Sequence, residues 1–142
     1  MLWFHPLLQL AAILLSFYVL RLGIARFKTQ HLHQRQPFDW KRHVRLGEVV
    51  LIVWLLGLLG GFLMVRLTWH AFFLTGMHAR IAVLMLPLIL IGLGSGIYLD
   101  RYKKRRLVLP LIHAINNLVL VVLAVMQIFF GLGVLWTYVL GW

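Results

Sequence analysis

The sequence predicts an all-α protein, a transmembrane four-helix bundle in which residues 1–142 form a single integral-membrane domain. Of its 142 residues, 63% are hydrophobic and only 12% are charged. A soluble domain of this size leaves too much surface exposed to hide so many apolar side chains. In lipid, backbone groups pair within helices or closed barrels, and four segments are too few for a barrel. Each apolar segment can span a hydrocarbon core of about 30 Å, and we expect helices over residues 2–26, 40–69, 77–102 and 107–140.

Each predicted helix has a recognisable start or flank. The chain begins Met-Leu-Trp-Phe-His, without the basic start of a cleavable signal peptide, so the first segment reads as a permanent span. Asp39 is suited to cap the second helix, and Thr75 or Gly76 the third. The short second and third connections make the helices that they join antiparallel neighbours. The first connection, residues 27–39, is longer and polar, and we expect a solvated loop.

Charge and cysteine content narrow the location and the class of function. The net charge is +11 and the chain has no Cys, which excludes disulfides, Cys-ligated iron–sulfur clusters and covalently attached haem. The basic residues gather at the first and third connections. The positive-inside rule therefore predicts that these connections are cytoplasmic and that both termini lie outside, in the periplasm. We expect an integral protein of the bacterial inner membrane whose charge is neutralised by lipids, and no nucleic-acid partner.

A spacing of His and Gly recurs in all four segments. Each segment carries a His near its N-terminal end and a Gly 18 residues later, which is about five helical turns, so both lie on one face about 27 Å apart. Glycine makes up 12 of 142 residues, and four matches at one offset exceed what composition alone predicts. The pairs are His5/Gly23, His43/Gly61, His78/Gly96 and His113/Gly131.

The predicted orientation sorts these residues into two layers, one in each leaflet. Two imidazoles from opposite helices can ligate one haem iron, and glycines on the other two helices leave room for the ring. The sequence thus predicts two haem b groups. We expect the outer haem at His5, His78, Gly61, Gly131 and Arg80, and the inner haem at His43, His113, Gly23, Gly96 and Arg45. The arginines are candidate partners of the haem propionates, and no catalytic residue is predicted.

At these residues the chain resembles a known group. The motifs are His5-Pro6, His43-Val-Arg-Leu-Gly47, His78-Ala-Arg80 and His113-Ala-Ile-Asn-Asn117. Bis-His haems stacked in a membrane helix bundle are similar to the layout of cytochrome b561-like electron-transfer proteins. The resemblance is architectural and covers nearly the whole chain. It implies that two b haems pass electrons between the membrane faces, often to or from a quinone or ascorbate.

The expected function is transmembrane electron transfer. Two imidazole ligands leave no open iron position, which favours electron transfer over oxygen activation. We expect an electron-transfer protein or oxidoreductase subunit, not a stand-alone enzyme. It would link a membrane quinone pool or a cytoplasmic-side donor to a periplasmic cytochrome or dehydrogenase. Two alternatives remain open: a (bacterio)chlorophyll-binding subunit of a photosynthetic complex, and a membrane anchor subunit without a cofactor.

Overall fold

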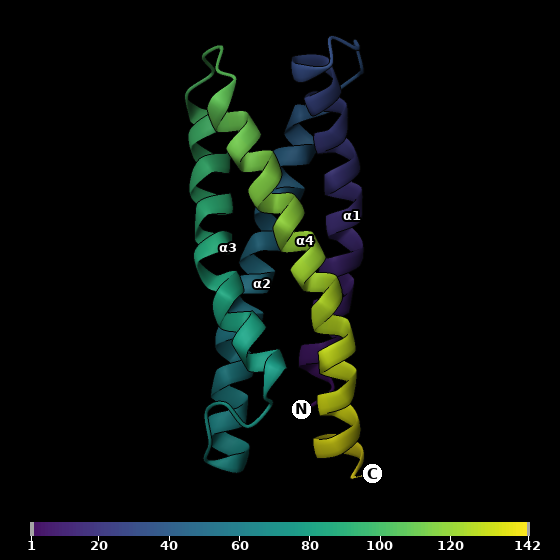
Figure 1. The fold of residues 1–142 in the computed structure, drawn as a ribbon, viewed down its shortest axis with the longest axis vertical. Coiled ribbons are helices and arrows are strands. Elements are labelled where there is room, and N and C mark those ends of the chain that lie inside the picture. The colour runs from purple at the N-terminus through teal and green to yellow at the C-terminus, as the bar shows by residue number, and fades with distance from the viewer. Residues whose placement is uncertain (1, 142) are drawn as a thin grey trace.

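Four long helices run along the molecule in the computed structural model, which describes residues 2–141 (Figure 1). The predicted all-helical fold is confirmed, and each of the four helices is long and apolar enough to cross a membrane. A short π-helical turn, η1, follows the last of them. The elements are α1 (Phe4–His31), α2 (Trp40–Trp69), α3 (Met77–Arg101), α4 (Val108–Leu135) and η1 (Trp136–Leu140).

Some helices end at other residues than predicted, because residues that are too polar for the membrane interior can still be helical. α1 continues past residue 26 to His31, because the polar residues after 26 suit a helix although they do not suit lipid. The last predicted helix ends as a π-turn, closed by Gly141 with a φ of 73°. Asp39 caps α2 as predicted, since its side chain accepts a hydrogen bond of 3.1 Å from the backbone N–H of Arg42. Gly76 precedes α3.

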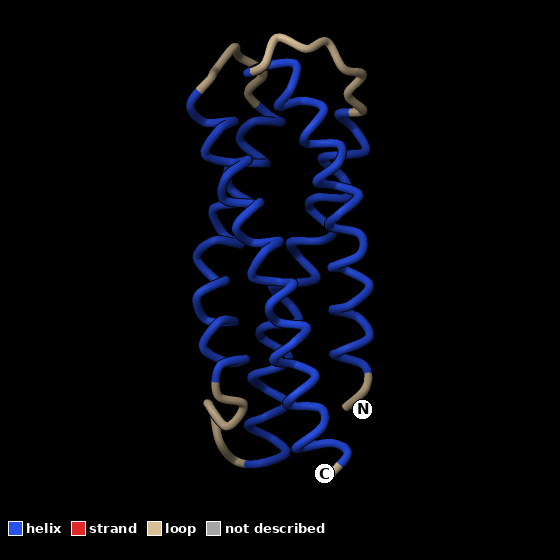
Figure 2. Tube along the Cα trace, turned by 45° about the vertical axis from the view of Figure 1, so that its right-hand side comes forward, coloured by secondary structure: helices blue, strands red, loops and turns tan. Residues whose placement is uncertain are grey.

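The helices form a square in which each packs against two neighbours. α1 contacts α2 and α4, and α3 contacts the same two helices. Within residues 2–141, the backbone of α1 does not approach that of α3, nor that of α2 the backbone of α4, so these two pairs of helices form the diagonals. The loops 32–39 and 102–107 lie at one end, which we call the basic end (Figures 1 and 2). Both ends of the chain and the loop 70–76 lie at the other, the terminal end.

The buried core occupies the middle of the bundle. Leu120 and Ile89 are the largest fully buried side chains, and Trp54 is only 4% exposed. All four helices contribute to this core, whereas many large apolar side chains remain exposed on the outside. Exposed apolar residues suit a surface that faces lipid. The core therefore separates the two ends of the bundle.

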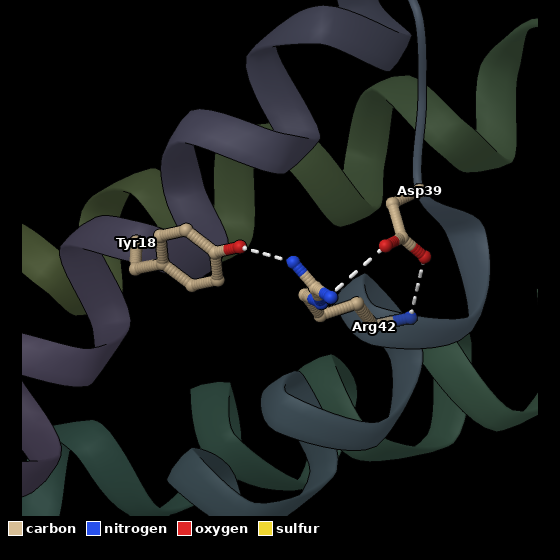
Figure 3. Close-up of polar contacts among 3 residues, drawn as sticks. All are labelled: Tyr18, Asp39 and Arg42. Carbon is tan, nitrogen blue, oxygen red and sulfur yellow. Dashed lines mark hydrogen bonds and ion pairs between the residues drawn. The ribbon is translucent and has the colours of Figure 1, made fainter.

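A polar contact fixes the start of α2 against α1 at the basic end (Figure 3). The Arg42 guanidinium donates a hydrogen bond of 3.1 Å to the Tyr18 hydroxyl. The same side chain forms an ion pair of 3.4 Å with Asp39. His43 is the next residue along α2. The first turn of α2, directly before His43, is thus connected to α1 and to the capping residue.

Candidate functional site

Two histidine pairs meet inside the bundle, one at each end. At the terminal end, the ring centroids of His5 and His78 lie 6.3 Å apart with their planes at 78°. At the basic end, those of His43 and His113 lie 6.4 Å apart with their planes at 72°. Each pair joins two helices on a diagonal, so the rings reach toward each other across the interior. The sequence predicts the same two pairings.

The separation of the rings suits one metal ion between two nitrogens. An imidazole nitrogen binds a first-row metal at about 2 Å, so two rings on opposite sides of one ion have centroids about 6 Å apart. No group of three or more His or acidic residues within residues 2–141 is placed to hold a bare metal ion. A structural zinc site needs about four protein ligands. A haem iron already has its ring nitrogens and needs only two further ligands, which is the number of histidines in each pair.

The glycines of the repeated spacing lie against these imidazoles. A Cβ added to Gly61 would stand 3.1 Å from His5 Cε1, and one added to Gly131 would stand 3.2 Å from His78 Cε1. At the basic end, Gly23 and Gly96 relate in the same way to His43 and His113, at 3.2 and 3.3 Å. From the sequence, we expect the glycines to leave room for a haem ring. In the structure, the imidazole from the adjacent helix occupies that room.

The backbone of α1 holds the His43 ring in one tautomer. Its Nδ1 lies 3.3 Å from the carbonyl oxygen of Val19. Because a carbonyl only accepts hydrogen bonds, Nδ1 must carry the proton and donate it. Nε2 then keeps its lone pair. Metal-binding histidines commonly have this second-nitrogen contact, which fixes the ring and raises its basicity.

The terminal end has a different polar environment. The Gln127 side-chain amide donates a hydrogen bond of 3.0 Å to the His78 carbonyl oxygen. His78 Nδ1 and Gln127 Oε1 are both buried, and neither has a hydrogen-bond partner among the described residues. The two ends thus share their His–Gly geometry and differ in the groups around Nδ1. His43 Nδ1 contacts the Val19 carbonyl oxygen, whereas His78 Nδ1 has no hydrogen-bond partner among the described residues.

The predicted arginines do not join the histidine pairs. Arg45 and Arg80 each follow a histidine by two residues and are exposed. A step of two residues turns a helix by about 200°, so each arginine lies on the opposite side of its helix from the histidine. Their role beside haem propionates stays a prediction.

Two polar residues that contact the histidines were not predicted from the sequence. Gln127 contacts His78, and Ser95 contacts His113. Each stands alone in an apolar run, Ser95 within residues 81–97 and Gln127 within residues 118–135. A lone polar side chain in a membrane span is costly and often functional. An isolated polar residue in an apolar segment was therefore the sequence signal that could have identified both positions.

A search of protein-family models, curated proteins and solved structures found no match to this chain.

Proposed function

We propose that this chain is a transmembrane electron-transfer protein that binds two b-type haems, one between His5 and His78 and one between His43 and His113. The observation that carries the proposal is the facing of each pair across a bundle diagonal, with ring centroids 6.3 and 6.4 Å apart. The number of ligands agrees, because each pair supplies the two axial positions of a haem iron.

The chain's own residues would hold and isolate the two groups. A haem with two imidazole ligands takes up and releases one electron and has no open position for oxygen. The glycines let each histidine approach the neighbouring helix. The apolar core around Leu120 and Ile89 separates the two pairs and excludes water between them. The pairs lie at opposite ends of the bundle, which suits transfer across the membrane.

The charge distribution supports an orientation in a bacterial inner membrane. Basic residues cluster in and beside the loops 32–39 and 102–107, so we place the basic end in the cytoplasm and both termini in the periplasm. On this view, a quinone or a cytoplasmic-side donor and a periplasmic redox protein exchange electrons with the two ends.

Labelling tests the orientation directly, because the chain has no native Cys. Arg35→Cys lies in the loop of the basic end, and Phe73→Cys, at a position 58% exposed, lies in the loop of the terminal end. In intact spheroplasts, an impermeant maleimide should label Phe73→Cys and spare Arg35→Cys. Both should react after lysis. The reverse pattern would contradict the proposed orientation.

The pyridine haemochrome spectrum of the purified protein tests the function. In the haemochrome, where pyridine replaces the protein ligands, we expect b-type haem at two per chain. The untreated protein should show low-spin bands in both oxidation states, because imidazole would fill both axial positions of each haem. Red-shifted chlorin bands would instead favour a pigment-binding subunit. The absence of any visible absorbance would favour an anchor without a cofactor. Either result would overturn the proposal.

A further inference from the structure

At the His43–His113 pair, the side chain of Ser95 forms a hydrogen bond with the ring of His113. Its Oγ lies 2.8 Å from His113 Nδ1 and 2.6 Å from the Ile91 carbonyl oxygen. The Ile91 carbonyl only accepts, so the hydroxyl proton is directed to it and the oxygen is left to accept from His113. A longer contact of 3.2 Å leads to the Gly92 carbonyl. In this arrangement, His113 Nδ1 carries the proton and Nε2 has the free lone pair.

A second polar group lies near the same nitrogen. The Asn117 side-chain nitrogen is 3.3 Å from His113 Nδ1, and it donates a hydrogen bond of 2.7 Å to the His113 carbonyl oxygen. That bond uses one of the two amide hydrogens of Asn117, and an amide nitrogen only donates, so this nitrogen of Asn117 cannot accept from the imidazole N–H. The Ser95 contact, at 2.8 Å, is also the shorter of the two at His113 Nδ1. Ser95 is therefore the acceptor available to the His113 ring.

We propose that Ser95 is a positioning residue that fixes His113 in the tautomer that binds iron through Nε2 and that lowers the reduction potential of the haem held there. The inference rests on the proposed function. A hydrogen bond from the outer N–H makes an imidazole ligand more basic. A more basic ligand stabilises ferric iron more than ferrous iron, which lowers the potential.

An internal correspondence in the chain provides the matched comparison. α2 and α3 carry the same pattern 35 positions apart, in His43/His78, Gly57/Gly92 and Gly61/Gly96. α1 and α4 carry another 108 positions apart, in His5/His113 and Gly23/Gly131. By these offsets, Gly60 has the sequence position relative to His5 that Ser95 has relative to His113. A Cβ added to Gly60 would meet no atom within 4 Å, so a serine fits there.

Redox titration of the intact protein tests the proposal through Ser95→Ala. In this variant, we expect the preference of the haem site at His43 and His113 for ferric over ferrous iron to fall about tenfold. That change raises the reduction potential of this haem by about 59 mV for one electron. The shift should affect only the component that His113→Ala removes. Ser95→Thr should keep the native potential, because its hydroxyl can make the same bonds to the preceding turn. The reciprocal variant Gly60→Ser should lower the potential of the other component only.

Two results would overturn the role of Ser95. One is a Ser95→Ala protein in which both potentials are unchanged or shift equally. The other comes from ¹⁵N spectra of histidine-labelled full-length protein prepared without haem. There, we expect His113 protonated at Nδ1 in the native chain and a loss of that preference in Ser95→Ala. Protonation at Nε2 in the native chain would contradict the proposal. A native protein that binds no haem would refute the proposed function, while the ¹⁵N spectra would still decide the role of Ser95.

Discussion

Replacing His113 or His43 with Ala should remove the same haem, and replacing His78 or His5 should remove the other. The members of each pair face one another, at 6.4 and 6.3 Å between ring centroids, so the loss of either ring would leave the proposed haem iron with a single protein ligand. Each variant should retain about half of the native haem. The measurement is haem content per chain together with the low-temperature α-band, in which the two components are resolved.

The control for these variants is His70→Ala. His70 is the residue directly after α2 at the terminal end and is exposed. It belongs to neither histidine pair, so its loss should leave both components in place. If His43→Ala and His78→Ala removed the same component, the pairing in the structure would not be the pairing that binds haem.

Gly131→Leu should disturb the haem at His5 and His78 and leave the other near normal, although Gly131 shares a helix with His113. A Cβ added at this position would stand 3.2 Å from His78 Cε1, and the rest of a leucine side chain would displace the imidazole. Overpacking a close-packed site costs about 1–3 kcal/mol, or about one to two decades of affinity if it falls on haem binding. Haem titration of the purified variant measures the loss. Gly96→Leu should act in the same way on the haem at His43 and His113 alone.

The chain supplies a control two residues from each of these glycines. Gly133 and Gly94 are exposed, and a Cβ added to either would meet no atom within 4 Å. Gly133→Leu and Gly94→Leu place the same side chain in the same helices and should leave both haems intact. Equal losses in a variant and its control would point to general helix damage. Two intact haems in Gly131→Leu would show that the spacing of His and Gly has no bearing on binding.

The four helices and the meeting of the histidines in two layers were predictable, because both follow from helical periodicity and segment length. A His and a Gly 18 residues apart must share a face, whatever the details of packing. Helix ends were less predictable: α1 extends to His31, since leaving the apolar region does not require a helix to stop. Hydrophobicity determines which part of a helix can lie in the membrane, whereas backbone propensity determines the residue at which the helix ends.

The immediate surroundings of the histidines were not predictable from periodicity. Which group accepts from an imidazole Nδ1 depends on side-chain rotation and on the approach of two helices, as at the contact of His43 with the Val19 carbonyl. The contacts of the glycines were likewise not predictable from periodicity. The spacing places Gly61 level with His5, but only the packing of α1 against α2 shows that the ring, rather than open space, fills the gap.

The distance between the two histidine pairs bears on the response of the protein to an electric field. Along each helix, the layers are 18 residues apart, or about 27 Å, which is nearly the full depth of a hydrocarbon core of about 30 Å. One elementary charge that crosses a membrane at 100 mV changes in energy by about 2.3 kcal/mol. A charge that moves from one pair to the other therefore passes through most of that voltage. Under the proposed function, the membrane potential would shift the distribution of electrons between the two haem sites, so redox measurements in an energised bilayer and in a detergent micelle are not equivalent.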